Sequence, residues 1–154
     1  MKNLLGSLLF IVILFVLVWI GSVDRTHPYV HPELETFVED WKNDVESTGL
    51  VWKNSFNRLD SITVLDSFPD QANAYVDFSK RVIYVSEKRL GADPIEIKAT
   101  VYHELGHWVF LLKHGDCAML RTTAHKRLEY YEYWEEMLAE YLETCKEHQI
   151  NSFL

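Results

Sequence analysis

Val101-Tyr102-His103-Glu104-Leu105-Gly106-His107 is the stretch around which the rest of the chain is organised, and it contains the pattern HExxH. Residues four apart on an α-helix project from nearly the same face, so His103 and His107 can direct both imidazoles at one metal ion. Glu104 lies about 100° further round the helix, where its carboxylate can take a proton from a metal-bound water. The stretch therefore predicts a helix that carries two Zn²⁺ ligands and a general base.

This helix is expected to begin at Asp93-Pro94-Ile95-Glu96. Asp93 can cap free backbone amides, Pro94 fits the first turn, and Glu96 follows three residues after the cap. Four apolar side chains are spaced to pack inward and to leave the histidines on an adjoining face: Ile95, Ala99, Tyr102 and Val109. This context favours a metal site over the simpler alternative, a helix with two solvated histidines and a surface glutamate.

A catalytic zinc usually has three protein ligands and one open position, so the two histidines need a third partner. His114 is the preferred candidate. On a continued helix it would lie about 10.5 Å along the axis from His107, so the helix must end before it. Gly115 can supply a left-handed residue for such a break, whereas Phe110-Leu111-Leu112 contains no glycine that would turn the chain earlier.

Glu136 is the alternative third ligand. It belongs to Glu136-Met137-Leu138-Ala139-Glu140, in which one carboxylate can bind zinc while the other orients a ligand histidine from behind. The predicted site is therefore His103 and His107 with His114, or with Glu136 in its place.

The remaining patterns predict an α+β domain with a short hairpin and a long C-terminal helix. Apolar residues at helical spacing predict an amphipathic helix over residues 33–47. β-branched residues predict a strand over Ser61–Leu65, and two further runs, Ala74–Phe78 and Arg81–Val85, predict a β-hairpin. After a loop from Gly115 to about Thr123, a long aromatic helix is expected from near Ala124 to His148.

The N-terminal residues are apolar from Leu4 to Ile20 except for Gly6 and Ser7. This length suits a membrane-spanning helix, and a cleaved signal peptide is the alternative. Residues 1–22 are therefore expected to be an anchor or a signal peptide, 23–32 a linker, and 33–154 one folded domain. Weak charge asymmetry favours a domain outside the cytoplasm, and cleavage would make it a secreted protein.

Composition excludes some partners. The formal net charge of −8 repels phosphate backbones, so a nucleic-acid partner is not expected. Cys117 and Cys145 both fall in the predicted outer domain, where a disulfide and two buried free thiols are equally compatible with the sequence.

Taken together, HELGH and the His114, Asp116 and Met119 that follow it resemble metzincin-like zinc peptidases. More specifically, PELETFVEDW, a short hairpin, VYHELGHWVF, a nearby His-x-Asp and an aromatic C-terminal helix resemble small putative metallopeptidases of bacteria and phages. The resemblance spans most of residues 31–142. The chain departs from the metzincin motif, which has glycine three residues after its second histidine and a third histidine six after, where this chain has Phe110 and Lys113. The pattern from Glu136 to Glu140 instead resembles gluzincins.

The resemblance implies a zincin fold and a zinc peptidase in which Glu104 is the general base and His103, His107 and His114 hold the metal. The apolar N-terminal run would anchor this peptidase to a membrane. It also implies that an edge strand, here within the hairpin 74–85, holds extended peptide or protein substrates. Two residues are candidates for supporting the oxyanion, His125 and Tyr131. The alternatives are an anchored interaction protein with a structural, four-ligand zinc site and a zincin that has lost turnover. The sequence specifies neither the substrate nor the oligomeric state.

Overall fold

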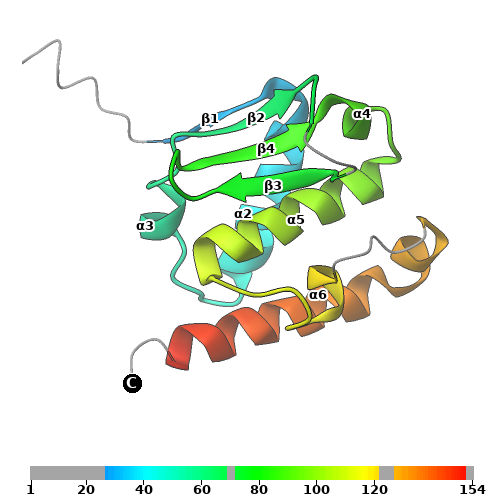
Figure 1. Cartoon of the computed structure of the whole chain (residues 1–154). Coiled ribbons are helices and arrows are strands. Elements are labelled where there is room, and N and C mark those ends of the chain that lie inside the picture. Colours follow the sequence, from blue (N-terminus) through cyan, green and yellow to red (C-terminus); the bar gives the residue numbers. More distant parts are fainter. Residues whose placement is uncertain (1–26, 69–71, 122–126, 152–154) are drawn as a thin grey trace, which may run out of the picture.

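The computed structural model describes residues 27–68, 72–121 and 127–151. Within these ranges a small sheet packs against helices, and a long helix ends the chain (Figure 1), which confirms the predicted α+β class. Residues 1–22, the predicted anchor or signal peptide, lie outside the described ranges. Among the described helices, none combines the length and the apolar character needed to cross a membrane.

The sheet contains four strands in the order β1-β2-β4-β3. The first three are parallel, and β3 pairs antiparallel with β4 at one edge. The predicted strand and hairpin are confirmed, and a two-residue strand is added in the region predicted to be a linker. The strands are β1 (Tyr29–Val30), β2 (Ser61–Leu65), β3 (Ala74–Asp77) and β4 (Val82–Ser86).

The hairpin turn forms without the glycine or asparagine that tight turns favour. Asp77 Oδ1 instead accepts hydrogen bonds from the backbone amides of Ser79 and Lys80, each at 3.0 Å. Arg81 has a φ of 58° and forms a two-pronged ion pair with Asp60. Side-chain contacts therefore hold the turn that places β3 at the open edge of the sheet.

The predicted helices are present, and several shorter ones join them. The predicted helix over 33–47 begins as the 3₁₀ turn η1 (Pro32–Leu34) and continues as α2 (Glu35–Ser47). The helix of the HExxH stretch is α5 (Pro94–Phe110), and Asp93 caps it by accepting from the Ile95 amide at 3.2 Å, as predicted. The other helices are α3 (Lys53–Phe56), α4 (Glu87–Leu90), the 3₁₀ turn η2 (Ala118–Leu120) and α6 (Arg127–Asn151).

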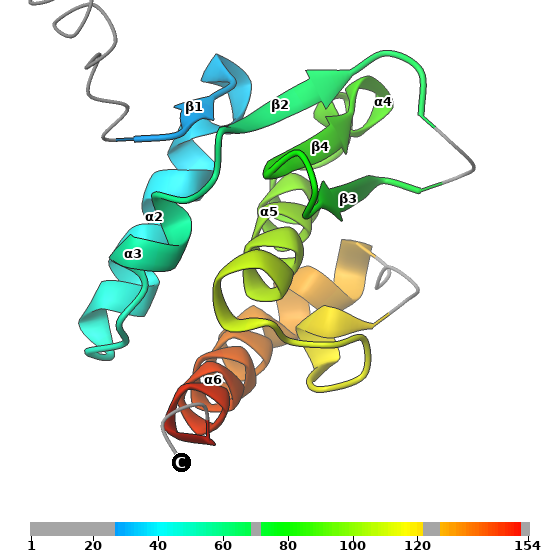
Figure 2. The ribbon, with the colours of Figure 1, turned by 60° about the vertical axis from the view of Figure 1, so that its left-hand side comes forward.

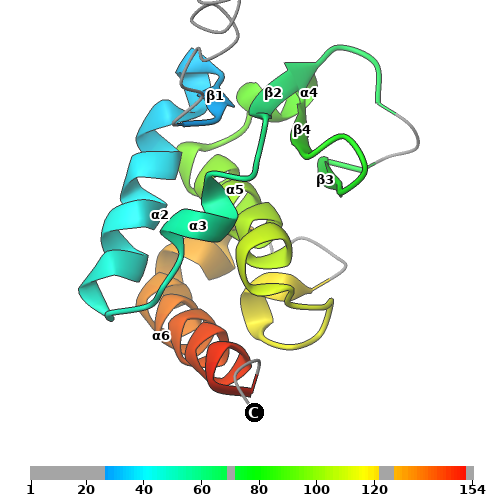
Figure 3. The ribbon, with the colours of Figure 1, turned by 90° about the vertical axis from the view of Figure 1, so that its left-hand side faces the viewer.

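Helix α5 lies at the centre of the domain. The sheet covers one side of it, with β3 alongside, and α6 packs on another (Figures 1 and 2). Helix α2 lies beside α5 on a side away from β3 (Figure 3). A helix held from three directions keeps its side chains in fixed positions, which a metal site requires.

Three large side chains join α2, α5 and α6 in the core: Trp41, Tyr102 and Tyr141 are fully buried. Trp41 Nε1 donates to the Tyr141 hydroxyl at 3.0 Å, and that hydroxyl donates to the Tyr102 carbonyl at 3.1 Å. A Cβ on Gly106 would lie 3.0 Å from the Tyr141 ring, so glycine allows α6 to approach α5 closely. Each such buried side chain contributes about 2–3 kcal/mol.

The two cysteines are free thiols. Cys117 and Cys145 are both buried, and no disulfide joins them. Burial raises the pKa of both thiols, so they behave as small apolar core residues.

Candidate metal centre

Helix α5 ends where the chain must turn back for His114 to approach the HExxH histidines. The last helical residue is Phe110, and Leu111 then adopts left-handed geometry with φ 56° and ψ 30°. The amide of Leu112 donates to the Gly106 carbonyl at 3.2 Å, which closes the helix end. The chain therefore turns at Leu111, four residues before Gly115, where the sequence predicted the left-handed residue. The left-handed conformation of a leucine costs about 1–2 kcal/mol.

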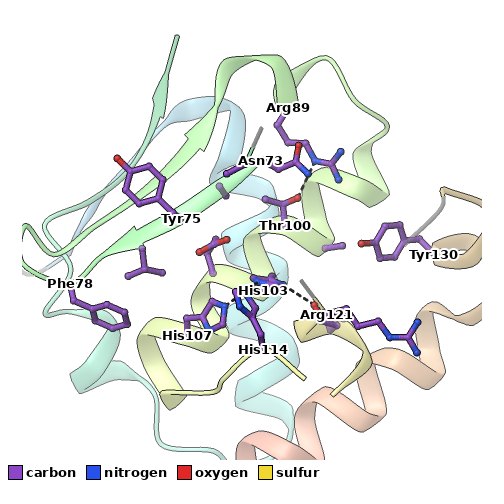
Figure 4. Close-up of a pocket in the computed structure, with 16 residues that line it drawn as sticks. Asn73, Tyr75, Phe78, Arg89, Thr100, His103, His107, His114, Arg121 and Tyr130 are labelled. Atoms are coloured by element: carbon purple, nitrogen blue, oxygen red, sulfur yellow. Dashed lines mark hydrogen bonds between the residues drawn. The ribbon is translucent and has the colours of Figure 1, made fainter. Parts of the chain in front are cut away.

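This turn brings the three predicted histidine ligands together. His103 Nε2 lies 3.0 Å from His107 Nε2 and 3.1 Å from His114 Nε2. One ligand nitrogen from each of these histidines lies within 4.8 Å of the others. Figure 4 shows the three rings converging beneath the edge of the sheet. The tetrahedral coordination that zinc prefers separates its ligand nitrogens by about 3.3 Å, so the spacing fits one ion.

Backbone carbonyls determine which ring nitrogens face the centre of the cluster. His103 Nδ1–H donates to the Met119 carbonyl at 2.9 Å, and His107 Nδ1–H donates to the Leu112 carbonyl at 2.6 Å. Because a carbonyl only accepts, each Nδ1 must carry the proton, and each neutral ring then presents a lone pair on Nε2. Facing lone pairs 3.0 Å apart repel one another without a cation between them, so the donor set fits a shared metal ion.

The surroundings also keep these histidines neutral. Burial lowers the pKa of His103 to about 4, with the neighbouring imidazoles acting in the same direction and the Met119 carbonyl opposing them. Burial likewise lowers the pKa of His107. Metal ligands must be deprotonated, so at neutral pH both rings are ready to bind. Nitrogen donors of this kind suit zinc and other late first-row divalent ions.

A short turn behind His103 holds its carbonyl partner in place. Met119 is buried in η2, and Glu140 Oε2 accepts a hydrogen bond from the Ala118 amide at 3.1 Å. In the Glu136 alternative, Glu140 was predicted to orient a ligand histidine; its contact here is instead with the backbone of the turn that carries Met119. Glu136, the alternative third ligand, is exposed on α6 and does not belong to the cluster.

Glu104 lies beside the histidines and is only 5% exposed. Burial raises its pKa from 4.5 to about 8. A cation bound at the neighbouring histidines would favour the ionised carboxylate. A carboxyl group in such surroundings can both take and return a proton near neutral pH, as a general base and acid must.

A cavity of about 470 Å³ opens beside the histidines between β3 and α5. Phe78 lies toward one end, where its ring stacks on Trp108 with centroids 5.5 Å apart, and Asn73, Arg89 and Thr100 lie at the other (Figure 4). Glu104 and the three histidines line the cavity between these ends. The histidines and the general base therefore face a space large enough for part of a peptide.

Of the two residues predicted to support the oxyanion, the structure describes only Tyr131. Tyr131 lies outside the lining of this cavity, and its hydroxyl donates to Asp93 at 2.7 Å, at the start of α5. His125 lies outside the described residues. The neighbouring Tyr130 lines the cavity instead. The helical pattern pointed to this aromatic segment, but it did not show which ring turns inward.

The described part of the chain thus combines three converging imidazoles, a buried carboxyl group and an adjoining cavity. Comparisons of the chain with models of protein families, with curated proteins and with solved structures found no match.

Proposed function

We propose that the protein is a zinc-dependent peptidase of the HExxH type with a zincin-like domain. The observation that carries this proposal is the convergence of three imidazole nitrogens, two of them oriented by backbone carbonyls, beside a buried glutamate in a cavity. His103, His107 and His114 would hold the ion. Zinc bound there would supply Lewis acidity, which makes water a better nucleophile and polarises the scissile carbonyl.

Glu104 is the residue that moves protons in this proposal. Its carboxylate takes a proton from the attacking water and then passes it to the leaving amine, so that one acid and one amine product result. Its burial excludes bulk water and raises its proton affinity. Substitution by glutamine keeps the volume and removes this proton transfer.

Strand β3 is the proposed binding edge for an extended peptide. It pairs with β4 on one side, and no described strand occupies its other side. Main-chain hydrogen bonds to such an edge can hold a substrate of any sequence, while the cavity next to β3 receives individual side chains.

A non-enzymatic protein with a structural zinc site is the alternative. Structural zinc usually has four protein ligands, whereas the cluster in the described residues contains three. Three ligands leave one position for water, and this favours the peptidase proposal.

The test uses the full-length protein in detergent, loaded with zinc and incubated with a quenched-fluorescent peptide library. We expect cleavage that a chelator abolishes and zinc restores. Glu104→Gln should retain zinc and lower kcat by several orders of magnitude. Glu136→Gln, a matched change at an exposed glutamate, should retain activity. Equal cleavage by the parent and Glu104→Gln would refute the proposed mechanism.

We also propose that residues 1–22 anchor the domain to a membrane, with the domain on the extracytoplasmic side. The support is the apolar run from Leu4 to Ile20.

A further inference from the structure

Arg89 lines the cavity but has no part in the proposed hydrolysis. Its side chain is only 10% exposed. Nε donates to the Thr100 hydroxyl at 3.1 Å, and Nη2 donates to the Glu96 carbonyl at 3.1 Å. Nη1 lies 3.8 Å from the Glu96 carboxylate, which is too far for a hydrogen bond. The guanidinium is therefore held in one orientation while Nη1 has no acceptor in the described part of the chain.

This arrangement leaves Nη1 able to bind a further acceptor. None of the described side-chain nitrogen and oxygen atoms is both buried and without a hydrogen bond, so Nη1 keeps contact with solvent, and its ion pair with Glu96 is longer than a hydrogen bond. Arginine presents a planar fork of N–H donors that matches a carboxylate. A substrate carboxylate in the cavity would supply the acceptor that Nη1 lacks.

The charges around the cavity favour the same kind of ligand. The chain carries a net charge of −8, yet the cavity is lined by two arginines, Arg89 and Arg121, and by one carboxyl group, Glu104. Glu96 pairs with Arg89 from outside the lining, and the lining itself still carries more positive than negative side chains, which favours anions at that place.

The direction of β3 indicates which part of a peptide would reach Arg89. The strand runs from Ala74, next to Asn73 at the arginine end of the cavity, toward Phe78. Antiparallel pairing is slightly more stable per residue than parallel pairing, and a peptide paired antiparallel to β3 has its carboxyl end toward Arg89.

The distance suits a residue close to the cleaved bond. The guanidinium spans from the Thr100 hydroxyl to the Glu96 carbonyl, and these residues precede His103 by three and seven positions, or about 4.5 and 10.5 Å along α5. An extended peptide advances about 3.3 Å per residue. One of the first three residues after the scissile bond would therefore lie beside Arg89.

We propose that Arg89 binds a carboxylate on the C-terminal side of the scissile bond and so determines which peptides are cleaved. The inference rests on the proposed peptidase function. The carboxylate is either the free C-terminus of a short peptide or the side chain of an aspartate or glutamate within a longer one.

The test compares peptide pools that differ only in the carboxylate. One pair has a free C-terminal carboxylate or a carboxamide, and another has glutamate or glutamine after the scissile bond. The full-length zinc-loaded parent should cleave the carboxylate form of one pair with a kcat/KM about 10- to 100-fold higher. The preferred pair identifies the source of the carboxylate.

Arg89→Gln should cleave the two forms with about equal kcat/KM, and Arg89→Lys should retain part of the preference. The rate on the neutral peptide controls for folding within each variant. Arg81→Gln is the matched control, because Arg81 also loses a charge and an ion pair but does not line the cavity. An unchanged preference in Arg89→Gln, or no preference in the parent, would overturn the proposal.

Binding separates this inference from the peptidase proposal. Fluorescence anisotropy on zinc-loaded Glu104→Gln measures the affinity for the same peptide pairs without turnover. Three results together would separate the two proposals: the parent cleaves nothing, Glu104→Gln binds the carboxylate form more tightly, and the double variant Glu104→Gln/Arg89→Gln binds both forms equally. The peptidase proposal then fails and the carboxylate site stands. Equal affinity for both forms overturns the carboxylate site.

Discussion

Replacing His114 by alanine tests the ligand set most directly. His114 lies in an exposed loop after the Leu111 turn, and the Lys113 amide in that loop donates to Asp116 at 2.6 Å, so truncating the imidazole leaves the local fold intact. Four-ligand structural zinc sites bind with about 10–16 kcal/mol, or roughly 3–4 kcal/mol per ligand. Loss of one ligand should therefore weaken zinc binding by about 10²–10³-fold.

Two measurements check this magnitude. Competition with a chromophoric chelator gives the zinc affinity, and thermal unfolding with and without zinc gives the stabilisation by the metal. The metal-free variant should unfold within about 0.5 kcal/mol of the parent, as exposed substitutions usually do. In saturating zinc the stabilisation should fall by about 3–4 kcal/mol, the same free energy as the lost affinity.

Two variants serve as controls for this experiment. His27→Ala removes an exposed histidine outside the cluster, and Glu136→Ala removes the alternative ligand. Both should bind zinc like the parent. Strong zinc binding by His114→Ala, together with loss by Glu136→Ala, would refute the ligand assignment.

Other predictions concern the surroundings of the site. Because burial raises the pKa of Glu104 from 4.5 to about 8, the native state favours its neutral form, so metal-free protein should lose stability as pH rises from about 4.5 to 8. Denaturant unfolding in the presence of a chelator should show the unfolding free energy falling by about 4 kcal/mol more than that of Glu104→Gln over this pH range. Parallel stability-against-pH profiles of the two proteins would contradict this prediction. Glu140→Ala removes an acceptor for the Ala118 amide and should weaken zinc binding about tenfold in the chelator assay. Unchanged zinc affinity would show that the turn carrying Met119 keeps its position without Glu140. The unfolding free energy of Leu111→Val should be about 1 kcal/mol lower than that of Leu111→Gly, because β-branched residues tolerate positive φ poorly. A higher unfolding free energy for Leu111→Val would argue against the left-handed turn. Full-length protein should remain in the membrane pellet after carbonate washing, and a soluble form beginning near Ser22 would identify a cleaved signal peptide.

The elements with a strong local pattern were predicted from the sequence. Helix α5 follows from its cap at Asp93 and its apolar spacing, and the hairpin follows from two short runs joined by Ser79-Lys80. The position of His114 was predicted only as one of two alternatives, because no glycine marks the turn that brings it back. Leu111 adopts its left-handed geometry next to buried Leu112, whose carbonyl accepts from His107.

Other features were missed because single residues do not reveal them. Strand β1 has two residues, too few for any periodicity. Adjacent residues on a helix point about 100° apart, so choosing Tyr130 rather than Tyr131 as the ring that lines the cavity required the rotation of α6. The non-helical geometry of Tyr133 also changes that rotation. Arg89 belongs to a four-residue helix, and only the packing of α4 against its neighbours brings it to the cavity.

The left-handed leucine has a consequence for how related sequences are sought. The metzincin pattern that the sequence resembles has three positions from its glycine to its third histidine, and three positions also lead from Leu111 to His114. The additional residue of this chain therefore lies before Leu111. A search pattern that fixes the interval after the turn, accepts any residue at the turn and allows the helix length to vary will therefore retrieve chains that a pattern with invariant glycine passes over.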